Sequence, residues 1–222
     1  MDFLSLFQFV GLFLFAFLFM GMTLYVRRSR KIKAVKLTAK NKGIQGILEI
    51  SLFAVVVAWA IEVVMYARNE DFRIFPPPLD LQLIQSAITG IIGVTLVVLG
   101  FVICILALKA LGASWRLGID KETPGELVTS GIYAYSRNPI YIFFNLYFLG
   151  TFLINKTLIF LLFTIFVALN LRFQIRAEEK FLLRIHGPAY QHYRMATDRF
   201  FTWRKIHPLM RSLAANKWGF SC

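Results

Sequence analysis

Long apolar runs alternate with short polar stretches along the chain, and this pattern predicts an all-α integral membrane protein with five transmembrane helices. The runs cover about residues 2–26, 44–66 and 81–111, and then 139–175, which the polar pair Asn155-Lys156 divides in two. In this last run we expect two antiparallel helices joined by a tight turn, the first shorter than a normal span. The run 81–111 is longer than a bilayer core needs, so we expect its helix to project from the membrane on the inner side.

The composition agrees with a membrane protein. Hydrophobic residues make up 58% of the 222 residues and include 23 Phe, which is too apolar for a soluble domain of this length. The formal net charge of +13 would suggest a nucleic-acid partner if the basic residues shared one soluble face. They fall between apolar runs instead, so we expect anionic lipid headgroups as their partners and no nucleic acid.

The distribution of Lys and Arg predicts the topology. If the N-terminus lies outside, only Arg68, Arg73 and Lys156 of the 25 Lys and Arg residues are external, which leaves 22 on the cytoplasmic side. Such a bias follows the positive-inside rule and predicts five spans with an external N-terminus and a cytoplasmic C-terminus. Because the N-terminal run does not resemble a cleavable signal and the loops are compact, we expect a bacterial inner membrane, or the endoplasmic reticulum if the chain is eukaryotic.

A polar, turn-rich stretch, ELVTSGIYAYSRNPIY, occupies Glu126–Tyr141 between two apolar runs. Asn138-Pro139 is typical of a helix start, because Asn is a favourable N-cap residue and Pro suits the first helical position. Polar backbone therefore gives way abruptly to a membrane helix here, which makes this junction the best candidate for a site. Further along, Gly187-Pro188 is typical of a helix end.

Polar residues recur at helical spacing on two of the predicted helices. One stripe contains Asn170, Gln174 and Glu178, where the last helix leaves the membrane, and the other contains Asn138, Tyr141 and Asn145. Two polar stripes at the inner interface predict a water-accessible cytoplasmic pocket between these helices.

Each of these residues also has a simpler interpretation. Arg137 at a membrane boundary is typical of a ligand for lipid phosphate. Asn138 can be a helix cap and nothing more. Glu178 and Glu179 can form a solvated face, paired with Arg172 or Arg176 at helical spacing. The histidines have no partners at ligand spacing, so we expect no metal site.

The stretch LVTSGIYAYSRNPIY, followed by a helical hairpin and RAEEKFLLRIHGPAYQHY, resembles the isoprenylcysteine carboxyl methyltransferase family and its wider relatives, which include phospholipid methyltransferases. The resemblance spans about Leu111 to Phe201. It divides the chain into three N-terminal transmembrane helices with a basic inner loop (1–110) and a methyltransferase-like region (111–222).

The resemblance implies S-adenosylmethionine as cofactor, bound in a cytoplasmic pocket, and a lipophilic acceptor that arrives from the bilayer. By position it implies a cofactor site made of Gly125, Glu126, Leu127, Val128, Tyr133, Asn138, Pro139, Ile140, Tyr141 and Glu178. The candidate catalytic residues are Arg137, Arg172, Arg176 and Glu179, and the candidate acceptor contacts are Gln174 and Asn145.

The chain departs from the family pattern at two positions. Asn138 stands where the family most often has His, and it keeps a polar side chain there. Gln174 stands where the prenylcysteine enzymes have an arginine that binds the acceptor, so the charge that would pair with a carboxylate is lost. Arg172 or Arg176 would have to supply that charge from a neighbouring face of the helix.

The resemblance favours O-methylation of an isoprenylcysteine-like carboxylate. Methyl transfer to a phospholipid amine or a small thiol is the alternative within enzymes. An amine or a thiol must lose a proton, for which Glu179 or a tyrosine would be the base. Outside enzymes, the alternative is a non-catalytic membrane scaffold.

Overall fold

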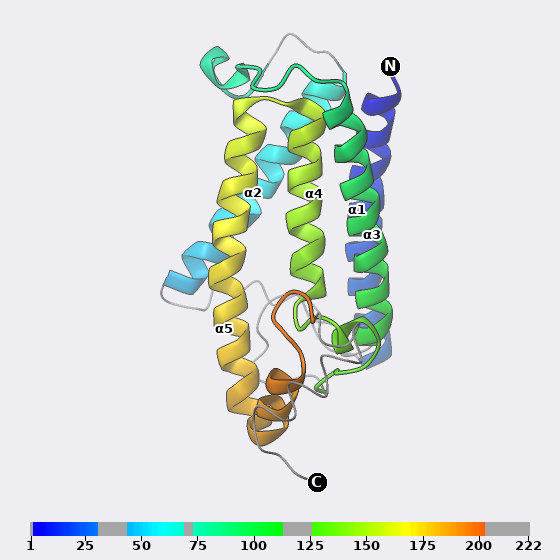
Figure 1. The fold of residues 1–222 in the computed structure, drawn as a ribbon, viewed down its shortest axis with the longest axis vertical. Coiled ribbons are helices and arrows are strands. Elements are labelled where there is room, and N and C mark those ends of the chain that lie inside the picture. The colour runs from blue at the N-terminus through cyan, green and yellow to red at the C-terminus, as the bar shows by residue number, and fades with distance from the viewer. Residues whose placement is uncertain (1, 31–43, 69–72, 113–125, 203–222) are drawn as a thin grey trace, which may run out of the picture.

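The computed structural model describes residues 2–30, 44–68, 73–112 and 126–202. Within them the chain forms five α-helices and two short 3-10 helices (Figure 1): α1 (Phe3–Arg30), α2 (Ile44–Ala67), η1 (Pro77–Asp80), α3 (Ile88–Leu111), η3 (Gly131–Ala134), α4 (Pro139–Asn155) and α5 (Leu158–Ala196). The helices form one elongated bundle in which successive helices run in opposite directions, with α2 crossing it obliquely. We refer to the end where α4 begins as the lower end and to the end near the N-terminus as the upper end.

Four of these helices, α1, α2, α3 and α5, are long and apolar enough to cross a membrane. The other, α4, has 17 residues and is therefore near the lower limit for a span, as predicted. The prediction of an all-α membrane protein is confirmed. The side of the membrane on which each terminus lies stays a prediction.

The predicted start of the third helix at residue 81 is wrong, because α3 begins at Ile88. The preceding backbone pairs with the turn between α4 and α5. The Leu83 N–H donates to the carbonyl of Lys156 at 2.8 Å, and the Leu158 N–H donates to the carbonyl of Leu81 at 3.0 Å. These hydrogen bonds fix an extended conformation, so the helix starts later than the apolar run does.

The predicted turn at Asn155-Lys156 is confirmed. Lys156 adopts a left-handed conformation with φ 65°, and its N–H donates to the carbonyl of Phe152. The side-chain amide of Asn155 donates to Gln8 Oε1 at 2.7 Å and to the Thr151 carbonyl at 2.9 Å. The hairpin is therefore tied to α1 as well as to itself.

Glycines allow α3 and α4 to pack with their backbones in contact, as the glycines of an apolar helix often do. A Cβ atom placed on Gly93 would lie 2.6 Å from the carbonyl oxygen of Gly150. A Cβ placed on Gly150 would lie 2.7 Å from the carbonyl oxygen of Gly93 and 2.6 Å from a methyl carbon of Val97. There is no room for a side chain at either position, so this contact fixes where α4 starts relative to α3.

Buried aromatic rings fill the core beside this contact. Trp59 of α2 packs on Phe148, with 4.6 Å between ring centroids, and Phe143 stacks on Tyr147 at 5.5 Å. Phe101 of α3 lies 5.4 Å from Phe143, so three helices share one aromatic cluster. Burial of such large rings is a main source of packing free energy in the bundle.

The last helix, α5, has 39 residues, and its straight part before Gly187 is about 43 Å long, which is longer than a bilayer core is thick. Its backbone leaves the helical conformation at Gly187, where φ is 50° and ψ is −123°. The prediction of a helix end at Gly187-Pro188 is therefore confirmed, although a second helical stretch follows as far as Ala196. This stretch turns back under the bundle, where Tyr190 and Tyr193 are buried.

Candidate functional site

The loop before α4 is anchored through the buried Tyr133 of η3. Its carbonyl accepts a hydrogen bond from the hydroxyl of Tyr193 at 2.7 Å, across 60 residues of sequence. Burial, and then the nearby carboxylate of Glu178, raise the pKa of Tyr133 well above its ordinary value, so this phenol is neutral. The carboxylate of Glu178 is therefore close enough to act electrostatically on Tyr133.

A hydrogen bond joins the first turn of α4 to the lower part of α5. The hydroxyl of Tyr141 donates to Glu178 Oε2 at 2.7 Å. Both side chains are half-buried. Tyr133, Tyr141 and Glu178, which the resemblance assigned to one cofactor site, therefore lie near one another at the lower end of the bundle.

The prediction that a helix starts at Asn138-Pro139 is confirmed. The prediction that the Asn138 side chain caps this helix is wrong. The side-chain amide of Asn138 donates to the Arg199 carbonyl at 3.1 Å and to Glu179 Oε1 at 3.5 Å, and makes no capping bond. The N–H groups of Tyr141 and Ile142 both donate to the Asn138 carbonyl. Because Pro139 has no N–H, the helix start offers at most the N–H of Ile140 to a ligand.

Glu179 lies between two arginines. Arg199 donates to both of its carboxylate oxygens, with Nη2 to Oε2 at 2.5 Å and Nε to Oε1 at 3.1 Å. Arg137 Nη2 lies 3.3 Å from Oε1, and its side chain is only 8% exposed, against 41% for Arg199. The hydrogen bond to Glu179 raises the pKa of Arg199 above its ordinary value, so this pair is fully charged.

This cluster corrects two simpler interpretations of the sequence. Arg137 is buried against Glu179, so it is not a surface ligand for lipid phosphate. Glu179 is only 12% exposed in its side chain, so it does not belong to a solvated face. Arg199 was missed by the sequence analysis, because it lies 20 residues after Glu179 in a segment with no recognisable motif.

Backbone hydrogen bonds fasten residues 197–202, which we call the closing segment, to the loop before α4. The Arg137 N–H donates to the Asp198 carbonyl at 3.1 Å, and the Thr202 N–H donates to the Tyr135 carbonyl at 2.7 Å. The Ser136 hydroxyl donates to the Arg199 carbonyl at 3.3 Å. The loop is therefore bound along its length by a segment that follows it by about 60 residues.

The candidate acceptor contacts lie on two different helices. Gln174 donates from Nε2 to Asn170 Oδ1 at 2.8 Å and is half-buried. Asn145 donates from Nδ2 to the Tyr141 carbonyl of its own helix at 2.7 Å. Arg172 and Arg176 are both exposed on α5. Neither arginine therefore shares the half-buried environment of Gln174.

The remaining cofactor residues lie at the start of the described loop. Glu126 is exposed, and Leu127 and Val128 are half-buried. Gly125 lies outside the described residues. The predicted cytoplasmic pocket also stays a prediction, because residues 113–125 lie outside the described part of the chain.

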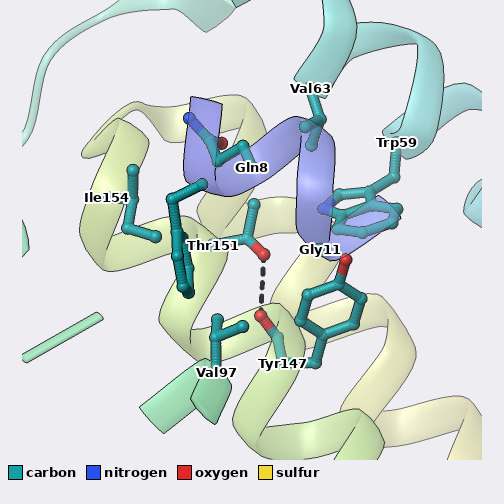
Figure 2. Close-up of a pocket in the computed structure, with 9 residues that line it drawn as sticks. Gln8, Gly11, Trp59, Val63, Val97, Tyr147, Thr151 and Ile154 are labelled. Carbon is teal, nitrogen blue, oxygen red and sulfur yellow. Dashed lines mark hydrogen bonds between the residues drawn. The ribbon is translucent and has the colours of Figure 1, made fainter. Parts of the chain in front are cut away.

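The small pocket in Figure 2 is at the opposite, upper end of the bundle. It has room for about one water molecule. Its lining comes from α1, α2, α3 and α4 and includes Gln8, Trp59, Tyr147 and Thr151. Such a cavity is far too small for a nucleoside, so it is separate from the candidate site.

Part of the candidate site, including Tyr133, Tyr141 and Glu178, lies in a region of the chain that matches a known family. Residues 88–189 match the model of the family described as phospholipid methyltransferase. This match confirms the resemblance stated from the sequence, which named these enzymes among the relatives. A search of curated proteins gives no match. The matched family is one of methyltransferases, and such enzymes typically use S-adenosylmethionine.

Proposed function

We propose that this chain transfers a methyl group from S-adenosylmethionine to a lipophilic acceptor that arrives from the bilayer. The observation that carries the proposal is the hydrogen bond between Tyr141 and Glu178, beside Tyr133, within the region that matches the methyltransferase family. These residues come from the loop, α4 and α5, so the fold assembles them from separate segments. The count of Lys and Arg on each side supports a cytoplasmic location for the site.

The residues present fit the chemistry of the cofactor. Glu178 is an acceptor for the methionyl ammonium group or the ribose hydroxyls, and the N–H of Ile140 is a donor for the methionyl carboxylate. The rings of Tyr133 and Tyr141 offer faces for the adenine and for the sulfonium cation. When bound, S-adenosylmethionine supplies an electrophilic methyl group. The protein contributes binding, orientation and exclusion of water.

Glu179 serves this site by positioning. Its carboxylate is bound by Arg199 and Arg137, so it is a poor base and instead fixes the loop before α4. For an acceptor that must lose a proton, Tyr141 is the better candidate. Its hydroxyl already donates a hydrogen bond to Glu178. Glu178 can take the hydroxyl proton of Tyr141, and the Tyr141 oxygen can then take the proton that the methyl acceptor loses.

The proposal also concerns the chemical class of the methyl acceptor. The resemblance to prenylcysteine enzymes favours a carboxylate, but Gln174 is neutral, and Arg172 and Arg176 are exposed elsewhere on α5. Neither Arg172 nor Arg176 therefore shares the half-buried environment of Gln174, where the missing charge would stand. Together with the phospholipid methyltransferase match, this favours a second candidate, N-methylation of a lipid amine.

Binding of S-adenosylmethionine to the purified protein, measured by calorimetry, tests the proposal. We expect saturable binding by the wild type and an affinity at least tenfold lower for Glu178→Ala, because a hydrogen bond to a charged group contributes about 1.5–3 kcal/mol. Lys180→Ala is the matched control, since Lys180 is exposed two residues further along the same helix. If the folded wild type binds no cofactor in detergent or in nanodiscs, the scaffold alternative stands.

A further inference from the structure

The outer face of α5 changes from apolar to cationic along the helix. Five large apolar side chains are exposed on its upper part: Leu162, Ile165, Phe166, Leu169 and Phe173. Four basic side chains are exposed on its lower part: Arg172, Arg176, Lys180 and Arg184. Because these four follow one another at intervals of four residues, they line up along the helix. We call them the cationic stripe.

The cationic stripe continues the face on which the apolar side chains lie. Lys180 follows Leu162 by 18 residues, which is five full turns of an α-helix at 3.6 residues per turn. The other side of α5 packs into the bundle, where Val167, Leu171 and Ile175 are buried. A molecule that lies along the outer face therefore meets apolar side chains on the upper part and basic side chains on the lower part.

The acidic residues of α5 do not neutralise the cationic stripe. The helix has two of them, Glu178 and Glu179. Glu178 accepts a hydrogen bond from Tyr141 of α4, and Glu179 is bound by Arg199 and Arg137. Both carboxylates are thus engaged at the candidate site, while the basic side chains are exposed. Such a separation leaves the outer face complementary to an anion.

The cationic stripe lies at the height expected for lipid headgroups. From the first residue of α5 its four members lie about 21, 27, 33 and 39 Å along the axis, at 1.5 Å per residue. A bilayer core is about 30 Å thick, and about 40–45 Å with both headgroup layers. Because α5 begins at the polar turn Asn155-Lys156, the stripe falls where the helix leaves the core at the other surface. Arg172 reaches that level by extending its long side chain.

We propose that the cationic stripe binds the headgroup of an anionic phospholipid whose acyl chains lie on the apolar face above it. A lipid with a net negative charge has the apolar and anionic parts in the order in which this face presents their partners. The site lies on a different face of α5 from Glu178, so the lipid is not the methyl acceptor and the inference does not depend on the proposed function. It assigns Arg172 and Arg176 to lipid binding rather than to catalysis.

Native mass spectrometry of the purified protein in detergent tests this inference. The protein is titrated with phosphatidylglycerol or with phosphatidylcholine of the same acyl chains, and the two affinities are compared. We expect the wild type to bind phosphatidylglycerol more tightly. Arg176→Gln/Arg184→Gln should lower that affinity about thirtyfold and leave the affinity for phosphatidylcholine unchanged, because each basic residue near anionic lipid contributes about 1 kcal/mol and 1.4 kcal/mol is a factor of about ten.

The matched control is Lys109→Gln/Arg194→Gln, which removes the same number of charges. Both residues are exposed, Lys109 in the last turn of α3 and Arg194 in the stretch after Gly187. We expect this variant to keep the wild-type preference for phosphatidylglycerol. Arg176→Lys/Arg184→Lys retains the charges and should lose less than about threefold in affinity, which separates the effect of charge from that of side-chain shape.

Three results would overturn the inference. One is a wild type with equal affinities for the two lipids. Another is an equal loss of phosphatidylglycerol affinity in both glutamine double variants, because the lipid would then respond to net charge and not to the cationic stripe. The third is displacement of phosphatidylglycerol by an equal concentration of glycerol phosphate, which has the anionic head without acyl chains. None of these results involves binding of S-adenosylmethionine, so the proposed function stands or fails separately.

Discussion

Replacing Gly150 with alanine is expected to destabilise the protein by about 3 kcal/mol, the upper range for overpacking. The added Cβ would lie 2.6 Å from a methyl carbon of Val97 and 2.7 Å from the carbonyl oxygen of Gly93. A side chain can turn away from such a contact, but the backbone carbonyl cannot, so α3 and α4 must separate. Thermal unfolding in detergent should show a clear drop in Tm.

Gly90→Ala is the matched control for this prediction. Gly90 is on α3, one turn before Gly93, and its Cβ would meet only Leu4 at an ordinary 3.5 Å. Since alanine favours a helix more than glycine does, we expect this variant to be neutral or slightly more stable. Equal Tm values for Gly150→Ala and Gly90→Ala would show that α3 and α4 do not pack through Gly93 and Gly150.

Glu179→Leu is expected to cost about 3–5 kcal/mol, the loss observed when one partner of a buried ion pair is removed. The reason is Arg137, whose side chain is 8% exposed and would be left without its counter-charge. Arg199→Leu should cost less than half as much, because the side chain of Arg199 is 41% exposed and Glu179 would still be paired with Arg137. Unfolding in denaturant gives the free energies.

A double variant shows whether the cost comes from the uncompensated charge. Arg137→Met/Glu179→Leu replaces both members by apolar side chains, which often restores stability when a buried pair is removed as a unit. We expect it to be more stable than Glu179→Leu alone. A double variant that loses the sum of the two single losses would mean that Arg137 and Glu179 act independently.

The helices were predictable because their signals are local. An apolar run of sufficient length forms a membrane helix whatever surrounds it, and Asn155-Lys156 and Gly187-Pro188 interrupt the helical conformation through their own backbone preferences. The start of α3 was not predictable in this way. It depends on the hydrogen bond that the Leu83 N–H donates to Lys156 and the one that the Leu81 carbonyl accepts from Leu158, in a turn about 75 residues away along the chain, which no local pattern records.

In the candidate site, too, contacts between residues far apart in the sequence could not be predicted from local patterns. Tyr141 and Glu178 were predicted together, because the resemblance supplies long-range information that a single sequence lacks, and the structure joins them at 2.7 Å. The roles of Asn138 and Glu179 were not predicted, since both depend on Arg199. The hydrogen bond from the Asn170 side chain to the Leu48 carbonyl of α2 was missed for the same reason, because it crosses 122 residues of sequence.

The contacts of the closing segment also bear on synthesis of the protein in the cell. Each of the four long apolar helices α1, α2, α3 and α5 can enter the membrane as it leaves the ribosome, since its backbone hydrogen bonds are internal. The loop before α4 is different, because Arg137, Ser136 and Tyr135 each also need a hydrogen bond with residues 198–202, which are made about 60 residues later. Membrane insertion and completion of the site are therefore separated in time, and the nascent chain passes through a stage in which it is inserted but not yet able to organise its site.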